Sequence, residues 1–165
     1  FPLILKKNRS TSSKNIYRIT NYKQLKNVPI KNFIAQKFII GDEYTCSVSN
    51  YNKNQKNIII LKRYLKNGDS VKVIHNQKAY KWMVDPLIEL YNRLDLWGPI
   101  NFQLKVNAHK IYIFEINPRF SGTTFMRSLF KYNEIDILIS NFFKLKHKIN
   151  LNDGIAVRYY NEKKI

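Results

Sequence analysis

The sequence lacks the residues and runs that disulfide-linked and membrane-spanning proteins need. Its single cysteine, Cys46, excludes an internal disulfide and a zinc site built from cysteines. The longest uninterrupted apolar runs are four residues, at 58–61 and 111–114, whereas a membrane-spanning helix needs about 20. These absences exclude a transmembrane helix, and they predict a protein of a reducing compartment, the cytoplasm, with no membrane partner.

Acidic residues are also scarce, with 11 Asp and Glu against 29 Lys and Arg and a formal net charge of +18. Such an excess normally indicates a nucleic-acid partner. The excess is nearly all lysine, however, with 22 Lys and 7 Arg, and Ile (22) and Asn (20) are raised with it. Codons rich in A and T specify Lys, Ile and Asn, whereas bidentate phosphate contacts favour Arg. The composition therefore favours codon bias, and a basic nucleic-acid-binding domain stays as the weaker alternative.

The content of hydrophobic residues is sufficient for a folded domain. The chain has 165 residues, of which 44% are hydrophobic and 14% aromatic, and this composition supports a buried core and excludes wholesale disorder. The chain starts at Phe1, without a methionine, in a strand-like run. We therefore expect it to be a piece of a longer protein, with an N-terminal part that precedes Phe1.

Apolar periodicity and turn residues predict strands and helices in an irregular order. Strands are expected at about 2–6, 15–19, 33–38, 43–49, 57–63, 100–106, 111–117 and 155–160, and short helices at 22–26, 122–131 and 134–146. A longer helix is expected with Asp85 as its N-cap, Pro86 as its first residue and Gly98 at its end. Because strands and helices do not alternate regularly, we predict the α+β class.

The two strands near 100–117 form an expected hairpin that carries polar side chains. A turn centred on His109 would place Gln103 opposite Glu115 and Asn101 opposite Asn117. Glu115 and Asn117 share a face because side chains alternate along a strand. One carboxylate with several amide oxygens suits Mg²⁺ that keeps other positions for water and phosphate oxygens. The alternative is the polar outer face of an ordinary hairpin, and the spacing alone does not decide between the two.

A motif in the second strand favours the metal site. Residues 115–119, Glu-Ile-Asn-Pro-Arg, resemble the Glu-x-Asn-Pro-Arg signature of the ATP-grasp superfamily, in its carbamoyl-phosphate-synthase-like and carboxylate–amine ligase branch. Four further segments resemble, in order, the family's strand–loop–strand over the triphosphate, its adenine hinge, its first metal-ligand strand and its closing strand: 1–16, 36–45, 98–103 and 154–160. The resemblance covers essentially the whole chain.

The resemblance implies a fold and an activity. The fold is a partial ATP-grasp fold, an antiparallel sheet flanked by helices, with residues 1–37 in a small phosphate-loop lobe and 38–165 in the C-terminal lobe. The activity is that of an ATP- and Mg²⁺-dependent ligase, which activates a carboxylate as an acyl phosphate for attack by an amine or a similar nucleophile. The implied partners are a small-molecule carboxylate, a small-molecule amine and the N-terminal part of the same protein.

The resemblance also implies which residues bind ATP. Lys6 matches the lysine that reaches the nucleotide phosphates. Gln36, with the backbone of Lys37 and Ile39, would meet the adenine edge. Glu43 would bind the ribose hydroxyls.

The implied metal and phosphoryl site lies further along the chain. Gln103, Glu115 and Asn117 match the ligands of Mg²⁺ (or Mn²⁺). Arg119 would face the transferred phosphoryl group or the acyl phosphate, and Arg63 is a possible second cation. Metals and cations would neutralise the charge that builds on the phosphoryl oxygens.

The expected phosphate loop departs from the family. Ser10, Ser12 and Asn15 stand where the family has glycines, whose backbone N–H groups approach phosphate closely, and Lys7 replaces a proline. Ser and Asn tolerate tight turns, so the loop can still cover ATP. The alternatives are a plain polar turn and, for the whole protein, a nucleotide-binding module that has lost catalysis.

Overall fold

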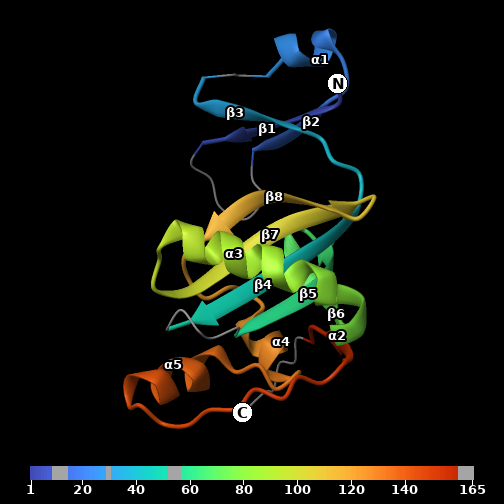
Figure 1. Cartoon of the computed structure of the whole chain (residues 1–165). Coiled ribbons are helices and arrows are strands. Elements are labelled where there is room, and N and C mark those ends of the chain that lie inside the picture. Colours follow the sequence, from blue (N-terminus) through green and yellow to red (C-terminus); the bar gives the residue numbers. More distant parts are fainter. Residues whose placement is uncertain (9–14, 29–30, 52–56, 160–165) are drawn as a thin grey trace, which may run out of the picture. The chain divides into compact units, whose positions relative to one another are not determined.

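The computed structural model describes residues 1–8, 15–28, 31–51 and 57–159 (Figure 1). Most of the expected phosphate loop, including Ser10 and Ser12, lies outside the described residues. Asn15 at the end of that loop is described, and its φ of 57° is in the left-handed region that favours glycine. Asparagine tolerates this conformation better than most residues.

The chain divides into two units, each with its own sheet. The first unit comprises Phe1–Ile40 with Asn67–Asp69, and the second comprises Gly41–Lys66 with Ser70–Ile165. The expected assignment of 1–37 and 38–165 to two lobes of the family fold stays a prediction.

The sheet of the first unit has three antiparallel strands in the order β2-β1-β3 (Figure 1). Its elements are β1 Leu3–Lys7, β2 Ile16–Ile19, the helix α1 Tyr22–Lys26 and β3 Phe33–Lys37. The helix begins where the Asn21 side chain accepts a hydrogen bond of 3.0 Å from the backbone N–H of Gln24. The predicted strands and helix of this part of the sequence are confirmed.

The second unit has a six-stranded sheet in the order β8-β7-β4-β5-β6-β9. Its strands are β4 Asp42–Asn50, β5 Ile58–Lys66, β6 Asp69–His75, β7 Gly98–Asn107, β8 Lys110–Asn117 and β9 Gly154–Val157. Strand β4 is antiparallel to β5 and β7, β7 to β8, and β6 to β9. The strands predicted from 43 to 117 are confirmed, as is the α+β class, and β9 is shorter than the predicted 155–160.

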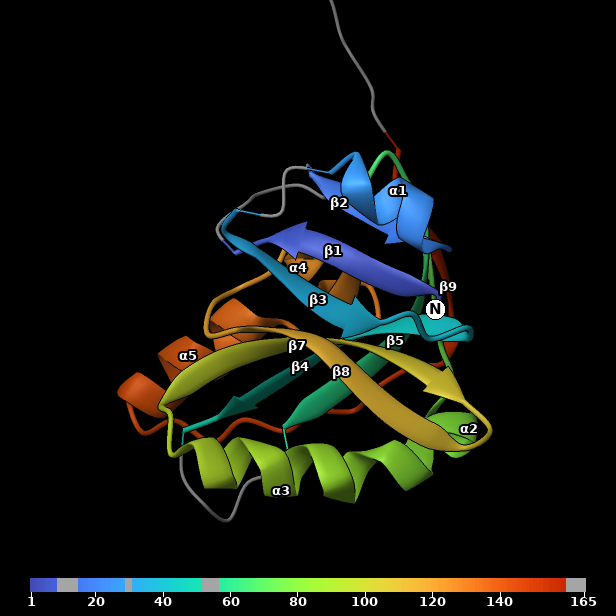
Figure 2. The ribbon, with the colours of Figure 1, turned by 90° about the horizontal axis from the view of Figure 1, so that it is seen from above.

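The two faces of this sheet carry separate apolar clusters. On one face, buried side chains of β4, β5 and β7, such as Cys46, Ile60 and Phe102, pack against α3 (Val84–Leu94). On the other face, Ile59 and Leu61 pack with residues of α4 (Thr124–Ser128) and α5 (Glu134–Phe142). Figure 2 shows α3 on one side of the sheet and α4 and α5 on the other. In the described part of the chain, no helix is long and apolar enough to cross a membrane.

The predicted boundaries of α3 are wrong at both ends. The helix begins at Val84 rather than after Asp85, because it continues a short helix, α2 (Gln77–Tyr80), and a 3₁₀ turn (Lys81–Met83). Pro86 is therefore the third residue of α3, in its first turn, where a helix tolerates proline. At the other end Asp95, with φ of 48°, caps the helix, and Gly98 already belongs to β7.

Strand β6 is absent from the sequence-based prediction, although the sequence contains a signal for it. Asn67 and Gly68 form the turn between β5 and β6, with φ of 53° and 89°. Two successive positive φ angles are what a two-residue hairpin turn needs, and Asn-Gly is the dipeptide that adopts them most readily.

The last two helices are shorter than predicted. Helix α4 covers Thr124–Ser128 and α5 covers Glu134–Phe142. Lys131 and Lys144 follow them with φ of 63° and 55°, and an α-helix cannot continue through such residues.

Candidate functional site

The turn of the β7–β8 hairpin differs from the expected one. It is a two-residue turn formed by Ala108 and His109, with φ of 46° and 60°. Asn107 is consequently opposite Lys110, which is one residue away from the register that a turn centred on His109 would give.

A β-bulge then restores the expected pairing. The register shifts between Gln103 and Leu104, so that β8 inserts Phe114 as one extra residue at this point. Beyond the bulge Gln103 lies opposite Glu115, and Asn101 lies opposite Asn117, as the sequence predicts. The prediction is confirmed for these pairs because the shorter turn and the bulge compensate one another.

Glu115 is the centre of the cluster that results. Its Oε1 accepts a hydrogen bond of 2.7 Å from Asn117 Nδ2, and Gln103 Nε2 lies 3.4 Å from the same oxygen. The Glu115 side chain is exposed and, among the described residues, no basic side chain lies within 4.0 Å of its carboxylate. In this arrangement both amides present their N–H groups to the carboxylate. A hard divalent cation would be bound by the carboxylate and by the amide oxygens, with the amide groups turned so that these oxygens face it.

Within the part of the chain that the structure describes, no three His, Cys, Asp or Glu side chains gather at one place. A cation at the β7–β8 hairpin would therefore be held by one carboxylate and amide oxygens of the protein. The remaining positions would be left for water and phosphate oxygens, as is usual for Mg²⁺.

Arg63 of β5 connects two other predicted site residues. Its Nη2 donates to Glu43 Oε1 at 2.6 Å and to Gln103 Oε1 at 2.7 Å, and its Nε donates to Glu43 Oε1 at 3.0 Å. The Arg63 side chain is 10% exposed and that of Glu43 is 21% exposed. The charge of Arg63 is thus matched by Glu43, and the same guanidinium fixes the amide oxygen of Gln103.

Arg119 lies just beyond β8 and is exposed. Its backbone N–H donates to the carbonyl of Asn117 at 2.8 Å, across Pro118, and its Nη1 donates to the carbonyl of Phe120 at 2.9 Å. Arg119 is therefore in the same turn as Asn117, a predicted metal ligand two residues before it. The catalytic roles of Arg119 and Arg63 stay predictions.

In the first unit, the sheet brings Lys6 and Gln36 to one face. Gln36 lies opposite Ile4 of β1, and Ile4 and Lys6 share a face because they are two residues apart. Lys37 is exposed and points to the other face, so only its backbone is available on the Gln36 side. Ile39 follows β3 and is half-buried. The nucleotide-binding roles of these residues stay predictions.

The sequence analysis missed a buried polar cluster next to the hairpin. Arg127 and Glu134 are fully buried and form an ion pair, with Nη1 to Oε2 at 3.0 Å. Arg127 also donates to Thr45 and Asn101, two residues on the sheet face that carries Gln103. The signal was the alternation of Thr45, Ser47 and Ser49 in β4, because hydroxyl side chains on one face of a buried strand need hydrogen-bond partners.

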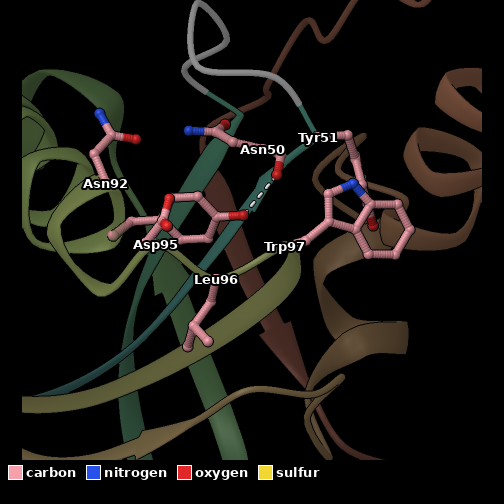
Figure 3. Close-up of a pocket in the computed structure, with 7 residues that line it drawn as sticks. Asn50, Tyr51, Asn92, Asp95, Leu96 and Trp97 are labelled. Atoms are coloured by element: carbon pink, nitrogen blue, oxygen red, sulfur yellow. Dashed lines mark hydrogen bonds between the residues drawn. The ribbon is translucent and has the colours of Figure 1, made fainter.

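A separate cavity of about 190 Å³ lies at the end of β4 (Figure 3). Its lining residues are Asn50, Tyr51, Tyr91, Asn92, Asp95, Leu96 and Trp97. The Tyr91 hydroxyl donates to the carbonyl of Asn50 at 2.6 Å, the dashed line of Figure 3, and lies 2.9 Å from the carbonyl of Gly98. The tyrosine therefore ties α3 to the ends of β4 and β7, and no predicted site residue lines this cavity.

The sequence matches one family model. The family model described as "ATP-grasp in the biosynthetic pathway with Ter operon" matches residues 30–163. No curated protein matches the sequence.

Several solved structures resemble the chain. N5-carboxyaminoimidazole synthetase from Staphylococcus aureus, solved with ADP, is 20% identical with a TM-score of 0.69, over 95% of this chain and 44% of its own. The biotin carboxylase domain of the Hydrogenobacter thermophilus 2-oxoglutarate carboxylase, solved with MgADP, ADP and bicarbonate, is 13% identical with a TM-score of 0.67, over 94% and 40%. D-alanine–D-alanine ligase from Bacillus anthracis is 19% identical with a TM-score of 0.58, over 87% and 55%.

These likenesses establish the fold, and the chain spans about half or less of each of those proteins. The fold is thus part of an ATP-grasp fold, with antiparallel sheets flanked by helices, as predicted. The family model covers most of the chain, including the β7–β8 hairpin with its cluster around Glu115. The chain therefore belongs to the ATP-grasp superfamily, in the family described as ATP-grasp in the biosynthetic pathway with Ter operon.

Proposed function

We propose that this chain is the ATP- and Mg²⁺-binding part of a ligase that joins a small-molecule carboxylate to an amine or a similar nucleophile. The observation that carries the proposal is the cluster of Gln103, Glu115 and Asn117 at the β7–β8 hairpin, with Arg119 in the turn that follows. The ADP in the S. aureus structure and the MgADP in the H. thermophilus structure support a nucleotide and metal site in this fold.

The proposed reaction has two steps. A carboxylate oxygen attacks the γ-phosphorus of ATP, the bond to the β–γ bridging oxygen breaks, and ADP leaves. The amine nitrogen then attacks the acyl carbon, the bond to the phosphate oxygen breaks, and inorganic phosphate leaves as the nitrogen loses a proton. Bound Mg²⁺ would neutralise the charge on the phosphoryl oxygens.

Different residues of the chain would bind the metal and the phosphoryl group. Gln103, Glu115 and Asn117 would hold the metal, and Arg119 would bind the transferred phosphoryl oxygens. Arg63 would orient Gln103 rather than carry a free charge, since Glu43 already accepts from it at 2.6 Å.

The proposed contacts to the nucleotide follow the family resemblance. Lys6 would donate to its phosphates, and Gln36 with the backbone of Lys37 and Ile39 would meet the adenine. Glu43 would accept from the ribose hydroxyls with its Oε2, since Oε1 is the oxygen that accepts from Arg63. The carboxylate and amine sites would lie largely in the rest of the protein, because the chain corresponds to 44% of the S. aureus synthetase.

Calorimetric titration with a non-hydrolysable ATP analogue, with and without Mg²⁺, tests the proposal. We expect saturable binding that requires Mg²⁺. Glu115→Gln should weaken it about tenfold, which is about 1.4 kcal/mol. The matched control is Glu89→Gln, since Glu89 is an exposed carboxylate on α3 that pairs only with Arg93 at 2.6 Å among the contacts described. Equal affinities of the Glu115→Gln and unsubstituted chains would remove Glu115 from the ligand set.

A second candidate is a nucleotide-binding module without catalysis, which the loss of loop glycines favours. Ser10 and Ser12 replace two of them, whereas Asn15 keeps the left-handed conformation. This candidate predicts Mg²⁺-dependent binding of ATP without release of phosphate in the complete protein, measured with a panel of carboxylates and amines.

A further inference from the structure

A buried ion pair lies on the sheet face that carries the proposed metal ligands. Arg127 of α4 and Glu134 of α5 are both 0% exposed, and Arg127 Nη1 donates to the two carboxylate oxygens of Glu134 at 3.1 and 3.0 Å. Removing two charges from water is costly, and well-packed apolar residues often serve stability equally well. The pair therefore calls for an explanation other than stability.

The second arm of the guanidinium reaches the sheet. Arg127 Nη2 donates to Asn101 Oδ1 at 2.5 Å and to Thr45 Oγ1 at 3.2 Å. Thr45 Oγ1 in turn donates to Asn101 Oδ1 at 2.7 Å. The amide oxygen of Asn101 thus accepts two hydrogen bonds, which fix the orientation of its side chain.

Glu134 holds Arg127 in this position. Its Oε1 accepts a hydrogen bond from the Ser47 hydroxyl of β4, and its Oε2 accepts one of 2.7 Å from Thr124 Oγ1. The carboxylate is therefore anchored to the sheet and to α4 at once. Its position determines where the guanidinium points.

The residues that Arg127 contacts are neighbours of the predicted metal ligands. Asn101 is the cross-strand partner of Asn117, and Thr45 is the cross-strand partner of Gln103. Directly opposed side chains in a sheet have Cβ atoms about 4.5–5.5 Å apart. One guanidinium therefore fixes the side chains adjacent to two of the three ligands.

We propose that Arg127, held by Glu134, is a positioning residue for the metal site and acts through Asn101 and Thr45 on Asn117 and Gln103. The proposal rests on the proposed function. Residues behind a metal site keep its ligands in the binding orientation, and their loss typically lowers metal affinity by about 10- to 100-fold. Arg127 is fully buried, so it would act through these neighbours rather than by direct contact with substrates.

The decisive variant is the double substitution Arg127→Met with Glu134→Leu. It replaces the pair by apolar residues of similar size, which leaves no buried charge unpaired. A purely structural pair predicts a folded chain with unchanged metal affinity, whereas a positioning role predicts a folded chain with weaker affinity. Arg127→Lys is the second variant, because its ammonium keeps the charge next to Glu134 but lacks the planar fork that reaches Asn101.

The readout is the dissociation constant of Mn²⁺ in the presence of a non-hydrolysable ATP analogue, measured by electron paramagnetic resonance. We expect it to rise about tenfold in both variants, with a changed spectrum of the bound Mn²⁺. The control is Leu87→Ala, which lowers stability from the opposite face of the sheet and should leave the constant unchanged. Thermal unfolding of each variant shows whether it is folded.

The outcomes separate the two proposals. If the unsubstituted chain does not bind Mn²⁺ with the analogue, the proposed function is overturned, and the positioning role with it. If the unsubstituted chain binds and both folded variants bind equally well, the positioning role alone is overturned. If the double variant does not fold, Arg127→Lys decides.

Discussion

Strand β4 presents two buried faces that are stabilised in different ways. Tyr44, Cys46 and Val48 alternate onto the face that packs against α3, inside an apolar cluster. Thr45 and Ser47 alternate onto the other face and are 1% and 0% exposed, yet each is hydrogen-bonded to a side chain from another element, Asn101 and Glu134 respectively. Apolar contact is non-directional, whereas a buried hydroxyl needs a partner at a particular place.

The two faces of β4 should therefore respond differently to substitution. On the α3 face, substitutions should cost stability in proportion to the apolar volume removed and should leave the proposed metal site intact. On the polar face, removing one partner leaves another buried polar group unsatisfied and also disturbs the neighbours of Gln103 and Asn117. The following predictions test this contrast.

The largest effect is expected from Arg127→Met alone. It leaves Glu134 as an unpaired buried charge and should lower the free energy of unfolding by about 3–5 kcal/mol. Urea denaturation of this variant and of the Arg127→Met, Glu134→Leu chain measures the difference. The double variant should recover most of the loss, and a single variant within about 1 kcal/mol of the unsubstituted chain would contradict the prediction.

A comparable loss of stability, without a loss of metal affinity, is expected from a substitution on the apolar face. Leu87 of α3 is 1% exposed, and Leu87→Ala should lower the free energy of unfolding by about 3 kcal/mol through lost burial and a cavity. Its affinity for Mn²⁺ and the ATP analogue should match that of the unsubstituted chain, measured under conditions in which both are folded. A tenfold loss of affinity would show that the two faces are not independent.

The smallest effect concerns the decrease in the free energy of unfolding at alkaline pH. Burial raises the pKa of the Cys46 thiol from 9.0 to about 12. Between pH 9 and pH 10 the unfolded chain releases this proton while the folded chain keeps it, so the native state binds more protons and the free energy of unfolding falls as pH rises. The fall from this thiol should be on the order of 1 kcal/mol over that unit of pH.

Urea denaturation at pH 8, 9 and 10 measures that slope, and Cys46→Val is its control. The control lacks the thiol, so its stability should change less over the same range. Identical slopes would show that the Cys46 thiol does not contribute. Above pH 10 the buried hydroxyls of Tyr51 and Tyr80, whose pKa values burial raises to about 12, should steepen the fall in both chains.

Much of the fold follows from local sequence. The predicted strands of both units, the helix at 22–26 and the pairing of Gln103 with Glu115 are confirmed. Side-chain alternation, turn residues and the motif at 115–119 are local features, so they can be recognised in the sequence without the three-dimensional contacts. The same kind of signal, Asn67-Gly68, was present for β6 as well, so that omission was not forced by the sequence.

Helix boundaries are harder to predict from the sequence, because several local signals compete at the end of a helix. Asp85 and Pro86 favour a helix start at that point in the sequence. The side chain of Asn76, however, accepts from the backbone N–H of Ala79 at 2.8 Å and begins α2 well before them. Packing of Tyr80 and Met83 into the apolar cluster keeps the chain helical from α2 to the first residue of α3.

The family motif, the two faces of each strand and the donor types of the proposed metal site could be predicted from the sequence, because they depend only on residue identity and a period of two. Three features depend instead on the packed chain: the turn and bulge that align Gln103 with Glu115, the link from Arg63 to Glu43 and Gln103, and the burial of Arg127 with Glu134. These features join residues that are distant in the sequence or depend on backbone angles that neighbouring strands impose. A polar residue in a sequence shows that it needs a partner, but only the packed chain determines which partner it finds.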